Sequence, residues 1–196
     1  KLDHKIKIGI PSDYLKNVTP EITAQIENTK KSLAGHDIEF IDVAFETTDY
    51  ALSTYYIIAP AEASSNLARY DGIRYGVREE GSNLDDIYLN SRTSGFGDEV
   101  TRRILIGTYV LSAGYYDAYY RQAQKVRRLI KDDFQRVFQE VDFILTPTTP
   151  NEAFKIGEKL DPIAMYMNDV FTVPTSLAGL PGISLPSGLS SNGLPL

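Results

Sequence analysis

A strand pattern, a helix pattern and a second strand pattern follow one another at the N-terminal end, and this order constrains the fold more than any other feature. The first pattern, KIKIGI, alternates polar residues with Ile6, Ile8 and Ile10, which is typical of a strand. DIEFIDV predicts the second strand, around Ile38–Val43. Strands joined through one helix over so short a distance are expected to pair in parallel, through a right-handed crossover. The chain is therefore predicted to belong to the α/β class.

Capping residues, prolines and glycines mark the other elements that we expect. Thr19-Pro20 places an N-cap residue before a proline at the first helical position, so a helix is predicted to about Leu33, with Gly35 at its C-terminal stop. Short strands are predicted at Phe143–Leu145, as a buried strand, and at about Gly182–Leu185. The remaining predicted helices are Thr48–Arg69 (kinked or interrupted at Pro60), Leu84–Arg92, Asp98–Ser112 (with Asp98 as N-cap), Tyr115–Val141 and one that starts at Asp161-Pro162.

Composition argues against several functional classes. The net charge of −6 argues against a stand-alone nucleic-acid binder, which is usually basic. Without cysteine the chain has no disulfide, thiolate zinc site or cysteine nucleophile, and with only His4 and His36 we expect neither a Ser-His-Asp relay nor a metal site. No apolar run approaches the roughly 20 residues of a membrane span, and no signal peptide is visible. We therefore expect a cytoplasmic location and no membrane partner.

An arginine on the apolar side of a predicted helix is the first candidate site residue. Arg103 falls within the apolar arc of the Asp98–Ser112 helix, whereas Arg102 points well away from it. A guanidinium on a buried side needs an anionic or hydrogen-bonding partner, because it does not lose its charge by deprotonation. The two open interpretations are a structural ion pair and a clamp for a ligand carboxylate.

Asp169, Tyr55 and Arg127 raise the same question. Asp169 stands among apolar residues and needs donors, which either loop hydrogen bonds or a ligand ammonium group can supply. Tyr55 begins a polar face of the Thr48–Arg69 helix, which is either solvated or the wall of a polar cleft. Arg127 lies on the apolar arc of the next long helix and again implies a partner. If Arg103, Asp169 and Tyr55 meet, they would suit a small zwitterion such as an amino acid.

The segment GYYDAYY, Gly114–Tyr120, is the densest aromatic cluster in the chain. Its rings are expected to supply one face of a helix, since the surroundings are not a basic groove of the kind that stacks nucleic-acid bases. No serine stands in a glycine-rich turn of the type that builds an oxyanion hole, and no lysine is evidently desolvated. The residues alone therefore indicate a binding site and assign no catalytic group.

Four long blocks resemble one family. They are Tyr55–Gly76 (YYIIAPAEASSNLARYDGIRYG), Gly95–Arg127, Asp142–Glu158 and Met165–Pro186, which ends in SLAGLPGISLP. Together they resemble the A subunits of heterotrimeric glutamyl-tRNA(Gln) amidotransferases, a family of amidase-signature enzymes. The resemblance implies a mixed sheet covered by helices. It also implies that residues 1–196 are the C-terminal part of that domain, and the start at Lys1 without an initiator Met agrees with a fragment.

The resemblance implies a glutaminase that works inside a larger complex. The A subunit releases ammonia from glutamine, and the B subunit uses ATP and Mg²⁺ to convert Glu-tRNA(Gln) to Gln-tRNA(Gln), while a small C subunit braces the pair. The catalytic set is Ser–cis-Ser–Lys, in a Gly/Ser-rich signature that precedes the region seen here. We therefore expect no catalytic residue, no metal and no cofactor in this chain, and no glutaminase activity from it alone.

The resemblance assigns the substrate pocket to the same three residues. Arg103 matches the arginine that binds the glutamine α-carboxylate, and Asp169 matches the aspartate that receives the α-amino group. Tyr55 matches a tyrosine near the pocket, with Tyr56 as the alternative alignment. Two other functions stay open: a stand-alone amidase of another small amide, and a non-catalytic interaction module with an amidase-like shell.

Overall fold

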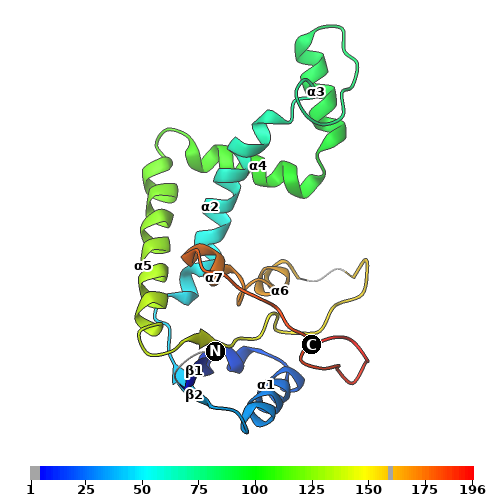
Figure 1. Cartoon of the computed structure of the whole chain (residues 1–196). Coiled ribbons are helices and arrows are strands. Elements are labelled where there is room, and N and C mark those ends of the chain that lie inside the picture. The colour runs from blue at the N-terminus through cyan, green and yellow to red at the C-terminus, as the bar shows by residue number, and fades with distance from the viewer. Residues whose placement is uncertain (1–4, 159–160) are drawn as a thin grey trace. The chain divides into compact units, whose positions relative to one another are not determined.

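The computed structural model describes residues 5–158 and 161–196, so Lys1 and His4 lie outside the described residues. The chain divides into two compact units, each described here by itself (Figure 1). The first unit comprises Lys1–Leu52 and Val126–Leu196, and the second comprises Ser53–Lys125.

A parallel sheet forms the base of the first unit. Strand β1 (Ile6–Pro11) pairs with β2 (Ile38–Val43) in a register that runs from Ile6↔Ile38 to Pro11↔Val43, and helix α1 (Pro20–Leu33) connects them. The predicted strand–helix–strand order and the parallel pairing are confirmed. A short 3₁₀ helix, Ser12–Asn17, follows β1 and was not predicted. Helix α1 ends at Leu33 as predicted, with Ala34 as its C-cap and Gly35 directly after it, although the φ of Gly35 is not positive.

A third strand, β3 (Phe143–Ile144), pairs with the other edge of β1, also in parallel, so the strand order is β2-β1-β3. This confirms the α/β class, and every pairing between these described strands is parallel. The prediction of a buried strand is wrong for Phe143, which is exposed, whereas Ile144 is half-buried.

No strand is assigned near Gly182–Leu185, where one was predicted, and Ile183 is 83% exposed. A strand exists only where a neighbour pairs with its backbone groups, and within the described residues this segment has no such neighbour. Glycines and prolines on both sides of a short apolar segment were therefore an insufficient signal for a strand.

Helix α1 and the part of α5 (Arg121–Val137) that belongs to the first unit both bury apolar side chains. The ring of Phe134 contacts that of Phe45 at a centroid distance of 4.5 Å, and Tyr14 contacts Phe171 at 5.2 Å. Each fully buried aliphatic or aromatic side chain contributes about 1.5–3 kcal/mol to folding. The buried apolar residues of this unit on those helices and the segments after them are Ile22, Ile26, Ile130, Phe134, Val137, Val141, Phe171, Val173, Leu177 and Ala178.

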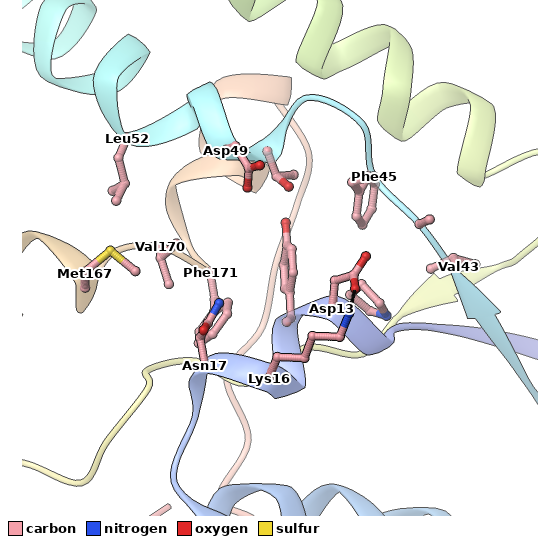
Figure 2. Close-up of a pocket in the computed structure, with 14 residues that line it drawn as sticks. Asp13, Lys16, Asn17, Val43, Phe45, Asp49, Leu52, Met167, Val170 and Phe171 are labelled. Carbon is pink, nitrogen blue, oxygen red and sulfur yellow. Dashed lines mark hydrogen bonds and ion pairs between the residues drawn. The ribbon is translucent and has the colours of Figure 1, made fainter.

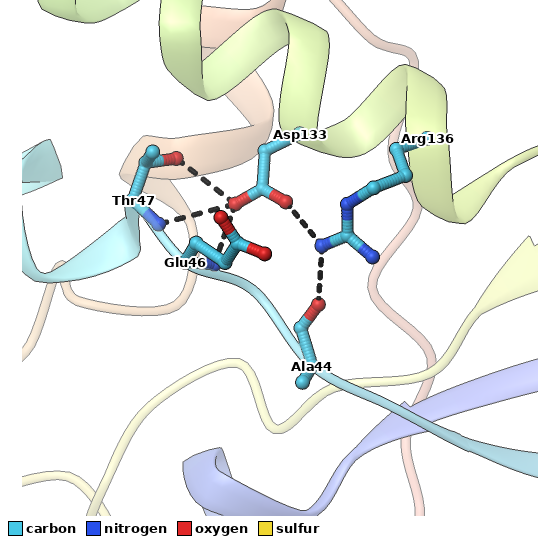
Figure 3. Close-up of polar contacts among 5 residues, drawn as sticks. All are labelled: Ala44, Glu46, Thr47, Asp133 and Arg136. Atoms are coloured by element: carbon cyan, nitrogen blue, oxygen red, sulfur yellow. Dashed lines mark hydrogen bonds and ion pairs between the residues drawn. The ribbon is translucent and has the colours of Figure 1, made fainter.

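One buried carboxylate joins α5 to the segment that follows β2 (Figure 3). Asp133, with a side chain only 5% exposed, accepts hydrogen bonds from the backbone N–H of Glu46 (2.7 Å) and of Thr47 (3.1 Å). It also accepts one from the Thr47 hydroxyl (3.0 Å) and forms an ion pair with Arg136 at 2.5 Å. Arg136 in turn donates to the Ala44 carbonyl at 2.8 Å. These hydrogen bonds hold the segment after β2 against α5, although this segment lies outside the sheet.

Two short helices follow the sheet strands in the first unit. Asp161 caps α6 (Pro162–Met167) by accepting from the backbone N–H of Ile163 and Ala164, which confirms the helix start predicted there. Helix α7 (Val173–Ala178) ends at Gly179, whose φ of 72° gives the left-handed cap that only glycine adopts without strain.

The second unit is helical. Helix α2 (Ala51–Asn66) enters it and continues through Pro60, which therefore does not interrupt the helix; an interruption was one of the two effects predicted for Pro60. Helix α3 (Leu84–Gly95) forms near the predicted range, and α4 (Asp98–Leu111) has Gly97 rather than Asp98 as its N-cap. A Cβ atom on Gly107 would overlap the Pro60 carbonyl, so only glycine permits the observed approach of α4 to α2.

The GYYDAYY segment does not continue α5 as predicted. It forms a π-helical turn, Tyr116–Tyr120, which ends where α5 begins, and α5 itself ends at Val137 rather than Val141. A π turn adds a residue to the helical repeat and so rotates the residues before it relative to those after it. Tyr116 and Tyr119 are consequently exposed instead of sharing the buried arc, and the ring of Tyr115 packs on Tyr109 with centroids 4.3 Å apart.

Candidate functional site

Arg103 and Tyr55 lie together in the second unit. Arg103 sits on α4, and its Nη1 donates to the Tyr55 hydroxyl on α2 at 3.4 Å. Its Nε donates to the Glu99 carboxylate one turn earlier on α4, at 2.8 Å. The guanidinium carbon lies 5.9 Å from the ring centroid of Tyr56, whose ring meets that of Tyr55 edge-on. Both candidate tyrosines therefore border the same guanidinium.

The guanidinium of Arg103 is only partly used by these contacts. Arginine has five N–H donors in a planar fork, and a carboxylate binds best when two of them point toward it together. Within the described residues, Nε and Nη1 have partners and Nη2 has none. The ion pair that was one of the two predicted interpretations is thus present, and it leaves donors for a second anion.

Arg102 and Arg103 differ in the way that the helical spacing predicts. The Arg103 side chain is 32% exposed and that of Arg102 is 57% exposed, although both pair with Glu99. Sequence reasoning missed Glu99 as the partner. The signal was available, because a glutamate four residues before an arginine on a helix is a favourable ion-pair spacing.

The polar face of α2 is largely solvated in the described chain. Glu62, Ser65 and Asn66 are exposed, as the solvated-face interpretation expects, whereas Tyr55 is half-buried. Tyr55 differs from the other residues of that face because its hydroxyl accepts a hydrogen bond from Arg103.

Asp169 lies in the first unit, whereas Arg103 and Tyr55 lie in the second. It is half-buried in the turn between α6 and α7. Its backbone N–H donates to the Tyr166 carbonyl at 3.2 Å, and its own carbonyl accepts from the N–H of Val173 at 3.0 Å and of Thr172 at 3.2 Å. These bonds hold the backbone on both sides of the carboxylate.

A separate pocket of about 520 Å³ lies entirely within the first unit (Figure 2). None of Arg103, Tyr55 and Asp169 is among its lining residues, although Met167 and Val170, on either side of Asp169 in the sequence, are. The lining is mainly apolar, and its charged residues are Asp13, Lys16 and Asp49. The full set is Pro11, Asp13, Tyr14, Lys16, Asn17, Val43, Ala44, Phe45, Thr48, Asp49, Leu52, Met167, Val170 and Phe171.

Tyr14 is the most perturbed group of this pocket. Its hydroxyl oxygen is fully enclosed, and no described residue meets it in hydrogen-bonding geometry. Burial raises the pKa of Tyr14 to about 12, and the Asp133 and Asp49 carboxylates add to the rise, while the nearby Thr48 hydroxyl offsets it only in part. Tyr14 is therefore a neutral packing residue at ordinary pH.

The raised pKa of Tyr14 predicts a loss of stability at high pH. Below pH 10 the phenol is neutral in both states; between about pH 10 and 12 the unfolded chain ionises first and the folded state does not. The free energy of unfolding should fall through that window, by about 2–3 kcal/mol in total from this group. Denaturant titrations at pH 9.5 and 11.5 on the parent and on Tyr14→Phe measure it. The phenylalanine variant should lose less stability over this interval, and equal losses would contradict the assignment.

Two further observations concern cofactors and membranes. Among residues 5–158 and 161–196, no cluster of three or more His, Cys, Asp or Glu side chains is arranged to hold a metal ion. In the same part of the chain, no helix combines the length and apolar character needed to cross a bilayer.

The fold agrees with the comparisons to known proteins. The model of the amidase family matches residues 1–196, and the chain therefore belongs to the amidase family. Relatives in that family are named as the A subunits of glutamyl-tRNA(Gln) amidotransferases. The one from Rhodospirillum rubrum is 58% identical over 193 residues, and the one from Caulobacter vibrioides is 62% identical over 188 residues.

A solved structure extends the similarity to three dimensions. The A subunit of the glutamyl-tRNA(Gln) amidotransferase from Thermotoga maritima is 40% identical, with a TM-score of 0.69, and the match covers 98% of this chain and 37% of that one. The matches to the two relatives cover 97% and 95% of this chain but only 39% and 38% of the relatives. The chain thus spans about two fifths of the length of the proteins it resembles.

Proposed function

We propose that this chain supplies the glutamine pocket of an amidotransferase A subunit, which releases ammonia for the conversion of Glu-tRNA(Gln) to Gln-tRNA(Gln). The observation that carries the proposal is the Arg103 guanidinium, which is oriented by Glu99 and Tyr55 and keeps Nη2 unused among the described residues. The identity of 58–62% to named A subunits supports the same conclusion.

The chemistry of the pocket follows from two opposite charges. Arg103 would hold the α-carboxylate of glutamine through its remaining N–H donors, and the Asp169 carboxylate would receive the α-ammonium group. A charge-assisted hydrogen bond contributes about 1.5–3 kcal/mol when it is shielded from water. A substrate that carries both charges is therefore preferred to a neutral amide of the same size. Tyr55 and Tyr56 would limit the rotation of the guanidinium.

The reaction also needs groups that are not assigned to this chain. We propose that the serine nucleophile and its Ser–Lys partners belong to another part of the whole protein, and that no residue of 1–196 is catalytic. We further propose that B and C subunits complete a cytoplasmic heterotrimer, in which the B subunit uses ATP and Mg²⁺. The chain itself is then expected to hold no cofactor.

The function is tested on the whole protein with its partner subunits. Glutamine-dependent ammonia release and formation of Gln-tRNA(Gln) are the expected results, together with calorimetric binding of glutamine to the whole A subunit. Release of ammonia from other small amides but not from glutamine would favour a stand-alone amidase. Failure to bind glutamine at all would favour a non-catalytic interaction module, and either result would overturn the proposal.

A further inference from the structure

Arg127 is an arginine on the buried side of α5 whose role the pocket does not explain. Its Nε donates to the carbonyl of Leu177, near the end of α7, at 2.9 Å. Both residues belong to the first unit. Within the described residues Arg127 forms no ion pair, so this carbonyl is the partner that the sequence required of it.

The bond satisfies two needs at once. A half-buried guanidinium keeps its charge and must find an acceptor. The last carbonyls of a helix have no partner within the helix, and they carry the negative end of its dipole. Leu177 is the penultimate residue of α7, so its carbonyl is one of these groups. Arg127 therefore caps the C-terminal end of α7 from the neighbouring helix α5.

The opposite end of α7 begins on Asp169. The Asp169 carbonyl accepts from the backbone N–H of Val173, the first residue of the helix, at 3.0 Å. The Thr172 N–H and hydroxyl donate to the same carbonyl, at 3.2 and 3.3 Å. Four of the six residues of α7 are buried, namely Val173, Pro174, Leu177 and Ala178. Because closely packed, buried segments transmit strain, we expect a shift at the C-terminal end of α7 to reach Asp169.

We infer that Arg127 is a positioning residue that sets the orientation of the Asp169 carboxylate through α7. The inference rests on the proposed function, because it gives Asp169 the role of receiving the substrate ammonium group. Arg127 itself does not contact the substrate and acts only through α7. Its effect is confined to how well the site distinguishes an amide with an α-ammonium group from one without it.

The test compares glutamine with glutaramate, the same amide without the α-amino group, as substrates of the whole enzyme. The parent should prefer glutamine in kcat/KM. Arg127→Met should reduce that preference at least tenfold by raising the KM for glutamine, with little change in kcat or in the KM for glutaramate. Arg127→Lys, which keeps the charge and one donor, should recover part of the preference. Arg128→Met is the matched control, since Arg128 is exposed and pairs with Asp132.

Asp169→Asn separates the inference from the function on which it rests. If Asp169→Asn leaves the preference unchanged, the ammonium role of Asp169 is wrong and the proposed function fails at that point. If Asp169→Asn abolishes the preference while Arg127→Met keeps it, the positioning role is wrong and the function stands. Equal losses on both substrates in Arg127→Met, with a lower melting temperature, would mean a purely structural role. If Arg127→Met does not fold, Arg127→Lys decides alone: an unchanged preference overturns the inference, and a reduced preference for glutamine supports it.

Discussion

Replacing Arg103 by alanine in the whole protein is expected to raise the KM for glutamine by about ten- to a hundredfold. The substitution removes the donors that would hold the α-carboxylate, and one charge-assisted clamp is worth about 1.5–3 kcal/mol. The carboxylate lies away from the amide that reacts, so the clamp binds the ground state and the transition state alike. The kcat should therefore change much less than KM. Initial rates of ammonia release over a range of glutamine concentrations measure both constants.

Arg102→Ala is the control for this experiment. Arg102 pairs with the same Glu99 carboxylate but is the more exposed of the two arginines, so the pair with Glu99 that its replacement removes is a surface ion pair. Surface pairs contribute about 0–1 kcal/mol, and the KM for glutamine should stay within about twofold of the parent value. An unchanged KM in Arg103→Ala, or equal increases of KM in both variants, would contradict the proposal that Arg103 binds the α-carboxylate of glutamine.

The largest expected effect on stability comes from Asp133→Ala, at about 3–5 kcal/mol. Loss of a buried carboxylate from a charged network costs this much because its part-buried donors lose their acceptor. Here those groups are the backbone N–H of Glu46 and of Thr47. Arg136 suffers less, since its side chain is 47% exposed and solvent can hydrate it. The midpoint of denaturant-induced unfolding should fall accordingly.

Asp132→Ala provides the comparison on the same helix. Asp132 forms an exposed ion pair with Arg128 at a spacing of four residues, which stabilises a helix by less than about 1 kcal/mol. The two substitutions remove the same carboxyl group from neighbouring positions. Similar losses of stability in both variants would show that the buried network has no special role.

Local patterns predicted the first part of the fold well. The β1–α1–β2 unit needed only a period-2 alternation, a Thr-Pro helix start and the short distance between strands, all of which are local. The missing strand near Gly182–Leu185 shows the limit, because a strand also depends on a partner that the flanking glycines and prolines do not reveal. The π turn at Tyr116–Tyr120 shows another, since one additional residue in the repeat changes which tyrosines face the core.

For the candidate site, only the placement of the side chains can be compared with the prediction. Helical spacing distinguished Arg103 from Arg102, and the exposures of the two side chains agree with it. The roles of Arg103, Asp169 and Tyr55 in binding glutamine stay predictions. Asp133 escaped notice, although it stands three residues after the buried Ile130 and one before Phe134. Its partners are backbone groups more than eighty residues away, and no periodicity encodes them.

The close approach at Gly107 has a consequence for how the Arg103–Tyr55 pair is built. Gly107 lies four residues after Arg103 on α4, and Pro60 lies five residues after Tyr55 on α2. Where these helices meet, hydrogen on one main chain faces oxygen on the other, with no side chain between them to act as a spacer. The distance between the Arg103 guanidinium and the Tyr55 hydroxyl therefore depends on how closely the two main chains approach each other at Gly107 and Pro60. Substitutions among the surrounding apolar side chains can change the stability of this helix pair without changing that distance.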